Sequence, residues 1–283
     1  MIDVIKNFIP RRFSSNKLEI PVVRLQGAIM DSSTSMSRTL SLSRCANLLE
    51  KAFAHKKSSV VALIINSPGG SPVQSRFIFR RIRDLAEEKN KKVLVFIEDI
   101  AASGGYMIAC AGDEIFADPS SIVGSIGVVS ASFGFPELLK KIGVERRVYT
   151  AGKNKVALDP FQPEKKADIE HLKSLQLEVH QTFIDLVKER RAEKLSDDAN
   201  LFTGMFWSGK KSVELGLIDG LNDIRSVIKE RFGNDARLRL ITPPKSFLGP
   251  KAPSGVTAHM IYTAVDSALM AVEERALWQR YGL

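Results

Sequence analysis

Residues 59–70 read Ser-Val-Val-Ala-Leu-Ile-Ile-Asn-Ser-Pro-Gly-Gly. The apolar run in this stretch does not alternate with polar residues and ends at a proline and two glycines. That pattern is typical of a strand buried on both faces of a parallel sheet. A helical pattern over residues 73–89 follows, and a second apolar run lies at 92–98. This succession of strand, helix and strand predicts an α/β fold with right-handed crossovers between parallel strands.

The rest of the chain extends this arrangement on both sides. Patterns of period two or of continuous apolar residues predict further strands at 18–29, 113–117, 122–130 and 145–149. Helical periodicity predicts helices at 40–55, 135–142, 164–193, 208–215 and 222–231. We divide the chain into an amino-terminal extension (1–17), one main domain (18–242) and a proline-rich linker with a carboxy-terminal helix (243–283, the helix at about 256–280).

Composition excludes several classes of protein. Cys45 and Cys110 form no CxxC pair or disulfide framework, which favours a reducing, cytoplasmic compartment. The net charge of +9 comes from short, scattered basic pairs without a nucleic-acid-binding motif, so we expect solvated faces and no nucleic-acid partner. The histidines show no metal-ligand spacing, and none lies near a predicted strand end or glycine turn, so we expect no metal site and no histidine triad. They are His55, His171, His180 and His259.

No segment has the length of a membrane span. The longest apolar run, residues 60–65, is far shorter than the ~20 residues that a bilayer requires. Residues 1–17 lack a signal-peptide core, but Ile2, Ile5 and Phe8 fall on one face of a helical projection. We expect this face to dock on protein, with peripheral contact at the inner membrane as the alternative.

Two glycine-rich strand ends carry the candidate chemistry. Gly69 and Gly70 follow the first buried strand, where backbone N–H groups can approach a ligand closely. Ser103 follows the next strand at the predicted start of a helix, and Gly104 and Gly105 are expected to leave room for substrate beside it. Since parallel strands end in one crevice, Ser103 is a candidate nucleophile; an ordinary helix N-cap is the competing interpretation.

A serine nucleophile needs a base, and lysine is the best candidate in this sequence. Lys153 and Lys155 follow the predicted strand at 145–149, with apolar neighbours on both sides. Burial disfavours the charged form of a lysine, which allows a desolvated amine to accept a proton. Spacing alone does not choose between the two lysines, because residues two apart in an extended segment face the same side.

The ordered set of motifs resembles the signal peptide peptidase A family of serine peptidases, including its shorter bacterial members. The matching stretches are Ile65-Asn-Ser-Pro-Gly-Gly70, Ala102-Ser-Gly-Gly-Tyr106, Gly124-Ser-Ile-Gly-Val128, Thr150-Ala-Gly-Lys-Asn-Lys155, Phe202-Thr-Gly204 and Gly216-Leu-Ile-Asp219. The resemblance covers residues 18–232. It implies Ser103 as nucleophile, Lys155 as general base, Ser125 as the hydroxyl that orients the lysine, and Gly70 and Gly104 as oxyanion donors.

The resemblance also implies a fold and a way of working. The expected fold is similar to the Clp protease and the crotonases: parallel sheets with surrounding helices, assembled as a homo-oligomer. The expected partners are peptide or protein substrates, with no cofactor. We expect two departures from the family: no amino-terminal membrane helix and a single copy of the domain. The alternatives are a non-catalytic oligomeric scaffold at the membrane surface and a crotonase-like acyl-CoA enzyme.

Overall fold

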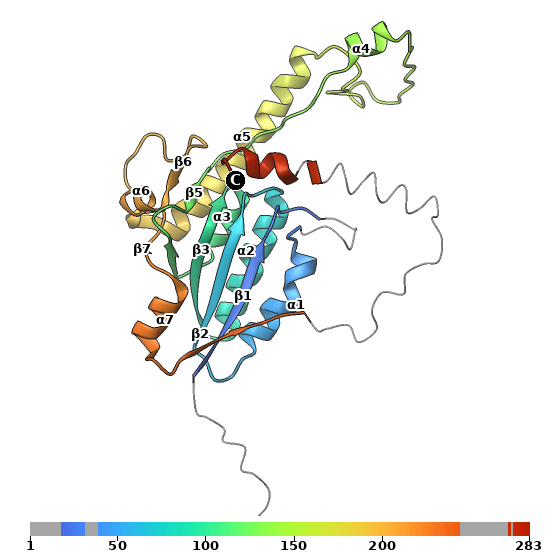
Figure 1. Ribbon diagram of the computed structural model, residues 1–283. Helices are drawn as coiled ribbons and strands as arrows, with labels where there is room; N and C mark the ends of the chain where they lie inside the picture. The colour runs from blue at the N-terminus through green and yellow to red at the C-terminus, as the bar shows by residue number, and fades with distance from the viewer. Residues whose placement is uncertain (1–17, 32–38, 244–270, 273) are drawn as a thin grey trace, which may run out of the picture.

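The computed structural model of the protein describes residues 18–31, 39–243, 271–272 and 274–283, so the extension 1–17 and most of the predicted linker lie outside the described residues (Figure 1). From residue 19 to residue 117, strands and helices alternate, as predicted. Their bounds, in chain order, are β1 (Glu19–Gln26), α1 (Leu42–Phe53), β2 (Val60–Ser67), α2 (Pro72–Glu88), β3 (Lys92–Ala102), α3 (Gly104–Ala109), β4 (Glu114–Ala117), β5 (Ile122–Gly124), α4 (Pro136–Lys141), α5 (Lys166–Arg191), β6 (Phe206–Ser208), α6 (Gly209–Glu214), β7 (Gly220–Leu221), α7 (Ile224–Phe232) and β8 (Arg237–Leu240).

The described strands form one eight-stranded, mostly parallel sheet. Its main path runs β6-β5-β3-β2-β1-β8; off this path, β4 pairs with β3, and β7 pairs with β4. The antiparallel pair β5–β6 is the exception to parallel pairing. β3 is long enough to pair with β2 along one edge and with both β4 and β5 along the other. The α/β prediction is confirmed, and a parallel sheet flanked by helices is the architecture that the resemblance implied.

β2 is buried on both faces, as its continuous apolar run predicts. Val61 and Leu63 belong to the core cluster under α1, α2 and α3, whereas Val60 and Ala62 belong to a second cluster covered by α7. Helices on both faces therefore exclude water from the centre of the sheet. The carboxyl ends of β2, β3 and β5 remain as the edge at which the candidate motifs meet.

A long projection leaves this body at the end of β5. Residues 129–165, which we call the arm, run outward along α5, include α4 and return to the start of α5 (Figure 1). The buried residues of α5 all lie in its second half, from Phe183 to Arg191. The first half of α5 therefore carries the arm away from the core.

Three predicted elements differ from the structure. Residues 145–149 do not form a strand, because no strand among the described residues lies beside the arm to pair with them. The strand predicted at 122–130 ends at Gly124, since Ser125 N–H bonds instead to the carbonyl of Met205. The predicted helix at 256–280 is observed only over 271–272 and 274–279, and its earlier part lies outside the described residues.

Candidate active site

Ser103 occupies a strained turn between β3 and α3. Its backbone has φ 52° and ψ −122°, a conformation that a non-glycine residue rarely adopts. Its N–H donates to the Gly124 carbonyl at 2.8 Å, which fixes the turn against β5. Ser103 is the N-cap residue of α3, but its side chain makes no capping hydrogen bond, so helix capping does not account for the hydroxyl. A half-buried hydroxyl is thus held at a helix start without a partner among the described residues.

The glycine turn after β2 lies directly against Ser103. A Cβ on Gly69 would lie 2.8 Å from the Cβ of Ser103, and Gly70 has φ 140°. Among the described residues, neither Gly70 N–H nor Gly104 N–H donates a hydrogen bond. Two free backbone donors beside a serine hydroxyl are what an oxyanion hole requires.

The prediction that Gly104 and Gly105 leave room for substrate is wrong. A Cβ on Gly104 would lie 2.2 Å from the hydroxyl oxygen of Ser75, and one on Gly105 would lie 2.5 Å from the carbonyl oxygen of Ser67. These glycines instead allow α3 to pack closely against α2 and β2. The close packing holds the start of α3, and hence Ser103, in place.

Ser125 follows β5 and lies beside Ser103. The register pairs Ala102 with Gly124, so the two serines leave neighbouring parallel strands at the same level. Ser125 also has a positive φ of 52° and is 3% exposed. The structure thus brings together two serines that stand 22 positions apart in the sequence.

A small apolar pocket opens between the sheet edge and α5. Ser103, Gly70 and Gly104 form its polar side. Its apolar side comes from α2, α3, the segment after Ser125 and α5. The apolar lining residues are Pro72, Met107, Val128, Val179 and Phe183.

Lys155 and Lys153 do not join this group within one copy of the chain. Both are exposed, in turns of the arm, and neither lines the pocket. Leu158 N–H bonds to the Asp168 carboxylate at 3.2 Å, which ties this part of the arm to the first turn of α5. Asp168 precedes Phe183 of the pocket by 15 residues (183 − 168), or about 22 Å along a helix. The lysine assignment stays a prediction.

Sequence reasoning missed two residues near Ser125. His180 on α5 lies 3.0 Å, by its Nε2, from the carbonyl oxygen of Ile126, so the statement that no histidine approaches a glycine turn is wrong. Tyr281, in the carboxy-terminal segment, donates its hydroxyl hydrogen to Ser125 Oγ at 3.1 Å. Neither contact has a signal in the local sequence, because α5 and residue 281 reach the site only through the tertiary fold.

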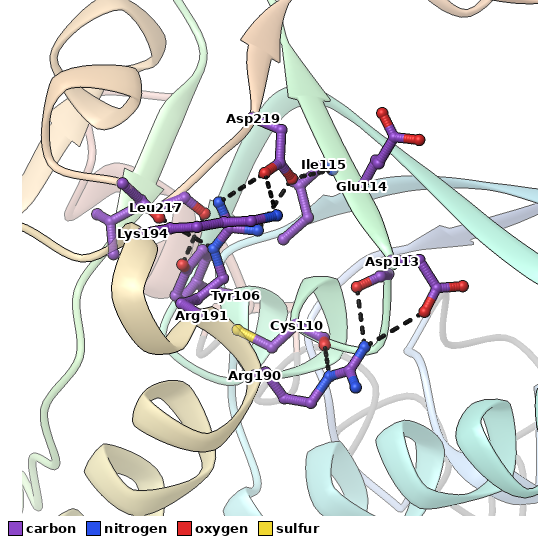
Figure 2. A network of polar contacts seen from close by, with 12 residues as sticks. Tyr106, Cys110, Asp113, Glu114, Ile115, Arg190, Arg191, Lys194, Leu217 and Asp219 are labelled. Atoms are coloured by element: carbon purple, nitrogen blue, oxygen red, sulfur yellow. Dashed lines mark hydrogen bonds and ion pairs between the residues drawn. The ribbon is translucent and has the colours of Figure 1, made fainter.

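A buried polar network fixes the lower end of α5 to the body of the protein (Figure 2). Arg191 is 2% exposed and donates to both carboxylate oxygens of Asp219, at 2.9 and 3.1 Å, and to the carbonyl of Gly216. Arg190 donates to the carbonyls of Cys110 and Gly112 at the end of α3. The helix that carries the arm is therefore anchored to the helix that begins at Ser103.

The electrostatics of this network favour the ionised pair. Burial alone would raise the pKa of Asp219, but the hydrogen bonds from Arg191 and Lys194 lower it below its ordinary value. Burial similarly opposes the charge of Arg191, and the Asp219 carboxylate outweighs this effect, so the pKa of Arg191 is raised.

The described residues contain no group of three or more His, Cys, Asp or Glu that could hold a metal ion. No helix among them is long and apolar enough to cross a bilayer.

Comparisons with known proteins place these features among peptidases. The chain matches the family model described as peptidase family S49 over residues 86–235. The serine protease SPPA, chloroplastic, of Arabidopsis thaliana is 32% identical across 74% of this chain and 31% of its own length. Protease 4 of Haemophilus influenzae is 29% identical across 75% of this chain and 34% of its own length.

A more similar relative carries a different name. A protein of Brucella abortus named Na(+)/H(+) antiporter NhaA is 63% identical over 287 residues, which cover 99% of this chain and 39% of that protein. The shared part therefore includes the residues that the peptidase model matches. The part aligned with this chain makes up 39%, 31% and 34% of the length of the Brucella, Arabidopsis and Haemophilus proteins, respectively.

Proposed function

The chain belongs to peptidase family S49, and on this premise we propose that it hydrolyses peptide bonds with Ser103 as nucleophile, Lys155 as general base and Ser125 as the hydroxyl that orients the base. The observation that carries the proposal is the Ser103 hydroxyl, which makes no hydrogen bond within the described residues. It is held in a strained turn beside the free N–H groups of Gly70 and Gly104. Strain of this kind persists where the surrounding structure enforces it, and it clusters at active sites.

We place the base in a second copy of the chain. Lys155 lies on the arm, away from Ser103 of its own copy, so one copy alone leaves the site without a base. The arm also exposes apolar side chains to solvent: Tyr149 is 91% exposed and Phe133 is 80% exposed. A surface of this kind favours burial against protein. An arm docked on a neighbouring copy would cover these residues and bring Lys155 to that copy's Ser103.

The enclosed amine would then act as the base. Removal of water disfavours the ammonium form, and the neutral amine accepts the Ser103 proton as the hydroxyl oxygen bonds to the peptide carbonyl carbon. The carbonyl electrons move to the oxygen, which Gly70 and Gly104 N–H hold. Collapse of this tetrahedral intermediate breaks the C–N bond of the peptide, and the lysine ammonium gives its proton to the leaving amine. Water then attacks the carbonyl carbon of the acyl ester and passes a proton to Lys155. The ester C–O bond breaks, Lys155 returns the proton to the Ser103 oxygen, and the carboxylic acid product leaves.

The pocket favours substrates with a small apolar side chain next to the cleaved bond, because its walls are apolar apart from Ser103 and the glycine backbone. An extended peptide fits beside the glycine turn, whose free N–H groups can bond to substrate backbone. Remnants of signal peptides and segments of membrane-associated proteins have this chemistry, and we propose them as substrates. We propose that the protein acts on them in the cytoplasm, in peripheral contact with the inner membrane.

Labelling with a fluorophosphonate probe tests the nucleophile and the base together. Wild-type protein is expected to react at one serine, whereas Ser103→Ala is expected to show no labelling. Lys155→Ala is expected to lose labelling and peptide hydrolysis, and Lys153→Ala is the matched control, since it removes an exposed lysine from the same turn. A wild-type protein that is not labelled at Ser103 would favour the non-catalytic scaffold.

Mixing inactive variants tests whether the site is shared between copies. If Ser103 and Lys155 come from different copies, equal amounts of Ser103→Ala and Lys155→Ala protein, dissociated and reassembled together, recover about one quarter of the wild-type sites. Recovery of no activity, from variants that assemble normally, would refute the shared site. Phe133→Asp on the arm should lower both the molar mass in light scattering and the activity, with the melting temperature of the body retained.

A further inference from the structure

The carboxy-terminal segment packs onto the sheet beside the candidate site. Figure 1 shows this helix, in dark red, lying next to the end of β5. Trp278 and Tyr281 contact apolar residues at the upper ends of β3 and β5. The residues beneath them are Ile100, Ala102 and Ile122. The segment thus covers the sheet face next to the turn that begins at Ser125.

Tyr281, which is buried in this packed segment, makes a side-chain hydrogen bond to Ser125. The hydroxyl hydrogen of Tyr281 is donated to Ser125 Oγ at 3.1 Å, across 156 positions of sequence. Tyr281 is 7% exposed and Ser125 is 3% exposed, so water does not compete for the bond. The Tyr281 ring meets Phe206 of β6 edge to face, with 5.1 Å between centroids, which limits its rotation.

The bond leaves Ser125 with one lone pair and its own hydrogen. A serine hydroxyl accepts two hydrogen bonds and donates one, and Tyr281 occupies one of the two acceptor directions. We propose that Tyr281 is a positioning residue of this peptidase: it fixes the Ser125 hydroxyl so that the remaining lone pair receives an N–H of the lysine base. This inference rests on the proposed function and adds a residue that lies outside the motifs of the catalytic domain.

The contact has a consequence for the protonation of the base. An oxygen that already accepts a hydrogen bond from Tyr281 is a weaker acceptor for an ammonium group, and hydrogen bonds to a charged form favour that form. Tyr281 therefore favours the neutral amine. The other ionisable groups nearby are Arg280, whose guanidinium lies 5.8 Å from the Tyr281 ring centroid, and His180, which contacts the Ile126 carbonyl.

Tyr281→Phe tests the role of the hydroxyl with the ring retained. We expect kcat to fall roughly three- to tenfold, the size of one hydrogen bond, with KM unchanged. We also expect the acid limb of the kcat/KM profile to move to higher pH, because the ammonium form is then favoured. In a His180→Asn background, Tyr281→Phe should still move the acid limb to higher pH. The shift is then not caused by titration of the histidine. Equal or higher activity in Tyr281→Phe, with an unmoved profile, would overturn the proposal.

A structural role alone is excluded by a matched control and a double-mutant cycle. Tyr106 is also buried and donates its hydroxyl hydrogen to the Leu217 carbonyl at 2.7 Å, so Tyr106→Phe removes a comparable hydrogen bond elsewhere. It should lower the melting temperature without moving the pH profile. In a Ser125→Ala background, Tyr281→Phe should have no further effect on kcat, whereas independent, additive effects would contradict the inference.

The outcome also separates this inference from the proposed function. If wild-type protein hydrolyses peptides in a Ser103-dependent manner but Tyr281→Phe behaves as wild type, only the positioning role fails. If Ser103 is not labelled and no peptide is cleaved by the wild type, the peptidase proposal itself fails.

Discussion

Arg191→Met is expected to destabilise the protein strongly without touching the candidate site. The substitution keeps a long apolar stem but removes the bonds to both Asp219 oxygens and to the Gly216 carbonyl. Breaking a buried ion pair by removing one partner costs about 3–5 kcal/mol. Asp219 keeps its bonds from Lys194, at 2.7 Å, and from Ile115 N–H, at 2.8 Å, which places the expected loss near the lower end, about 3 kcal/mol.

The loss can be measured by thermal and urea unfolding. For a chain of this size, a change of 1 kcal/mol moves the melting temperature by about 2–4 °C, so a loss of about 3 kcal/mol lowers it by roughly 6–12 °C. Arg239→Met is the matched control, because Arg239 pairs with Glu19 on the surface, outside the arm, with side chains 57% and 41% exposed. An exposed pair contributes at most about 1 kcal/mol.

A double-mutant cycle identifies the cause of the loss. Removing both charges, as Arg191→Met with Asp219→Asn, should cost less than the sum of the single substitutions, because no unpaired charge then stays buried. A loss below about 1 kcal/mol for Arg191→Met, equal to that of the surface control, would contradict a stabilising role for the buried ion pair. It would mean that the network in Figure 2 does not hold α5 to the body.

Other predictions follow from burial, backbone geometry and charge. Burial raises the pKa of the Cys45 and Cys110 thiols to about 12, so neither should react with Ellman's reagent at pH 8 in the folded protein, and both should react after unfolding; fast reaction of either in the native state would contradict their burial. Gly70→Ala should abolish activity and lower the melting temperature, because φ is 140° and the new Cβ would lie 2.2 Å from the Ile29 carbonyl oxygen; an active, stable variant would rule out this conformation. The folded pKa of Asp219 is depressed, so its contribution to stability is complete above the unfolded pKa of about 3.9 and is lost as the pH falls through the folded pKa. The free energy of unfolding, from urea titrations between pH 6 and 3, should therefore fall less in Asp219→Asn than in wild type. An equal fall in both proteins would contradict the depressed pKa.

Part of the site could be read from local sequence because its determinants are local. The buried strand at 60–67, the glycine turn and the serine at a helix start each depend on residues within a few positions, and the structure has all three. The predicted strand at 145–149 failed because a strand also needs a partner, and the arm provides none in one copy. Short strands such as β6 exist because a neighbouring strand is present, so their three residues carry little signal of their own.

The α/β succession, the glycine turn after β2 and the serine that follows β3 can all be inferred from local sequence. They follow from the period of apolar residues and from the backbone freedom of glycine. Three relations are visible only in the folded chain: Ser125 lies beside Ser103, Lys155 lies away from both on the arm, and Tyr281 reaches Ser125. Each of them joins residues tens to more than a hundred positions apart. They depend on strand register and helix packing, which bury surface cooperatively and leave no pattern in a short stretch of sequence.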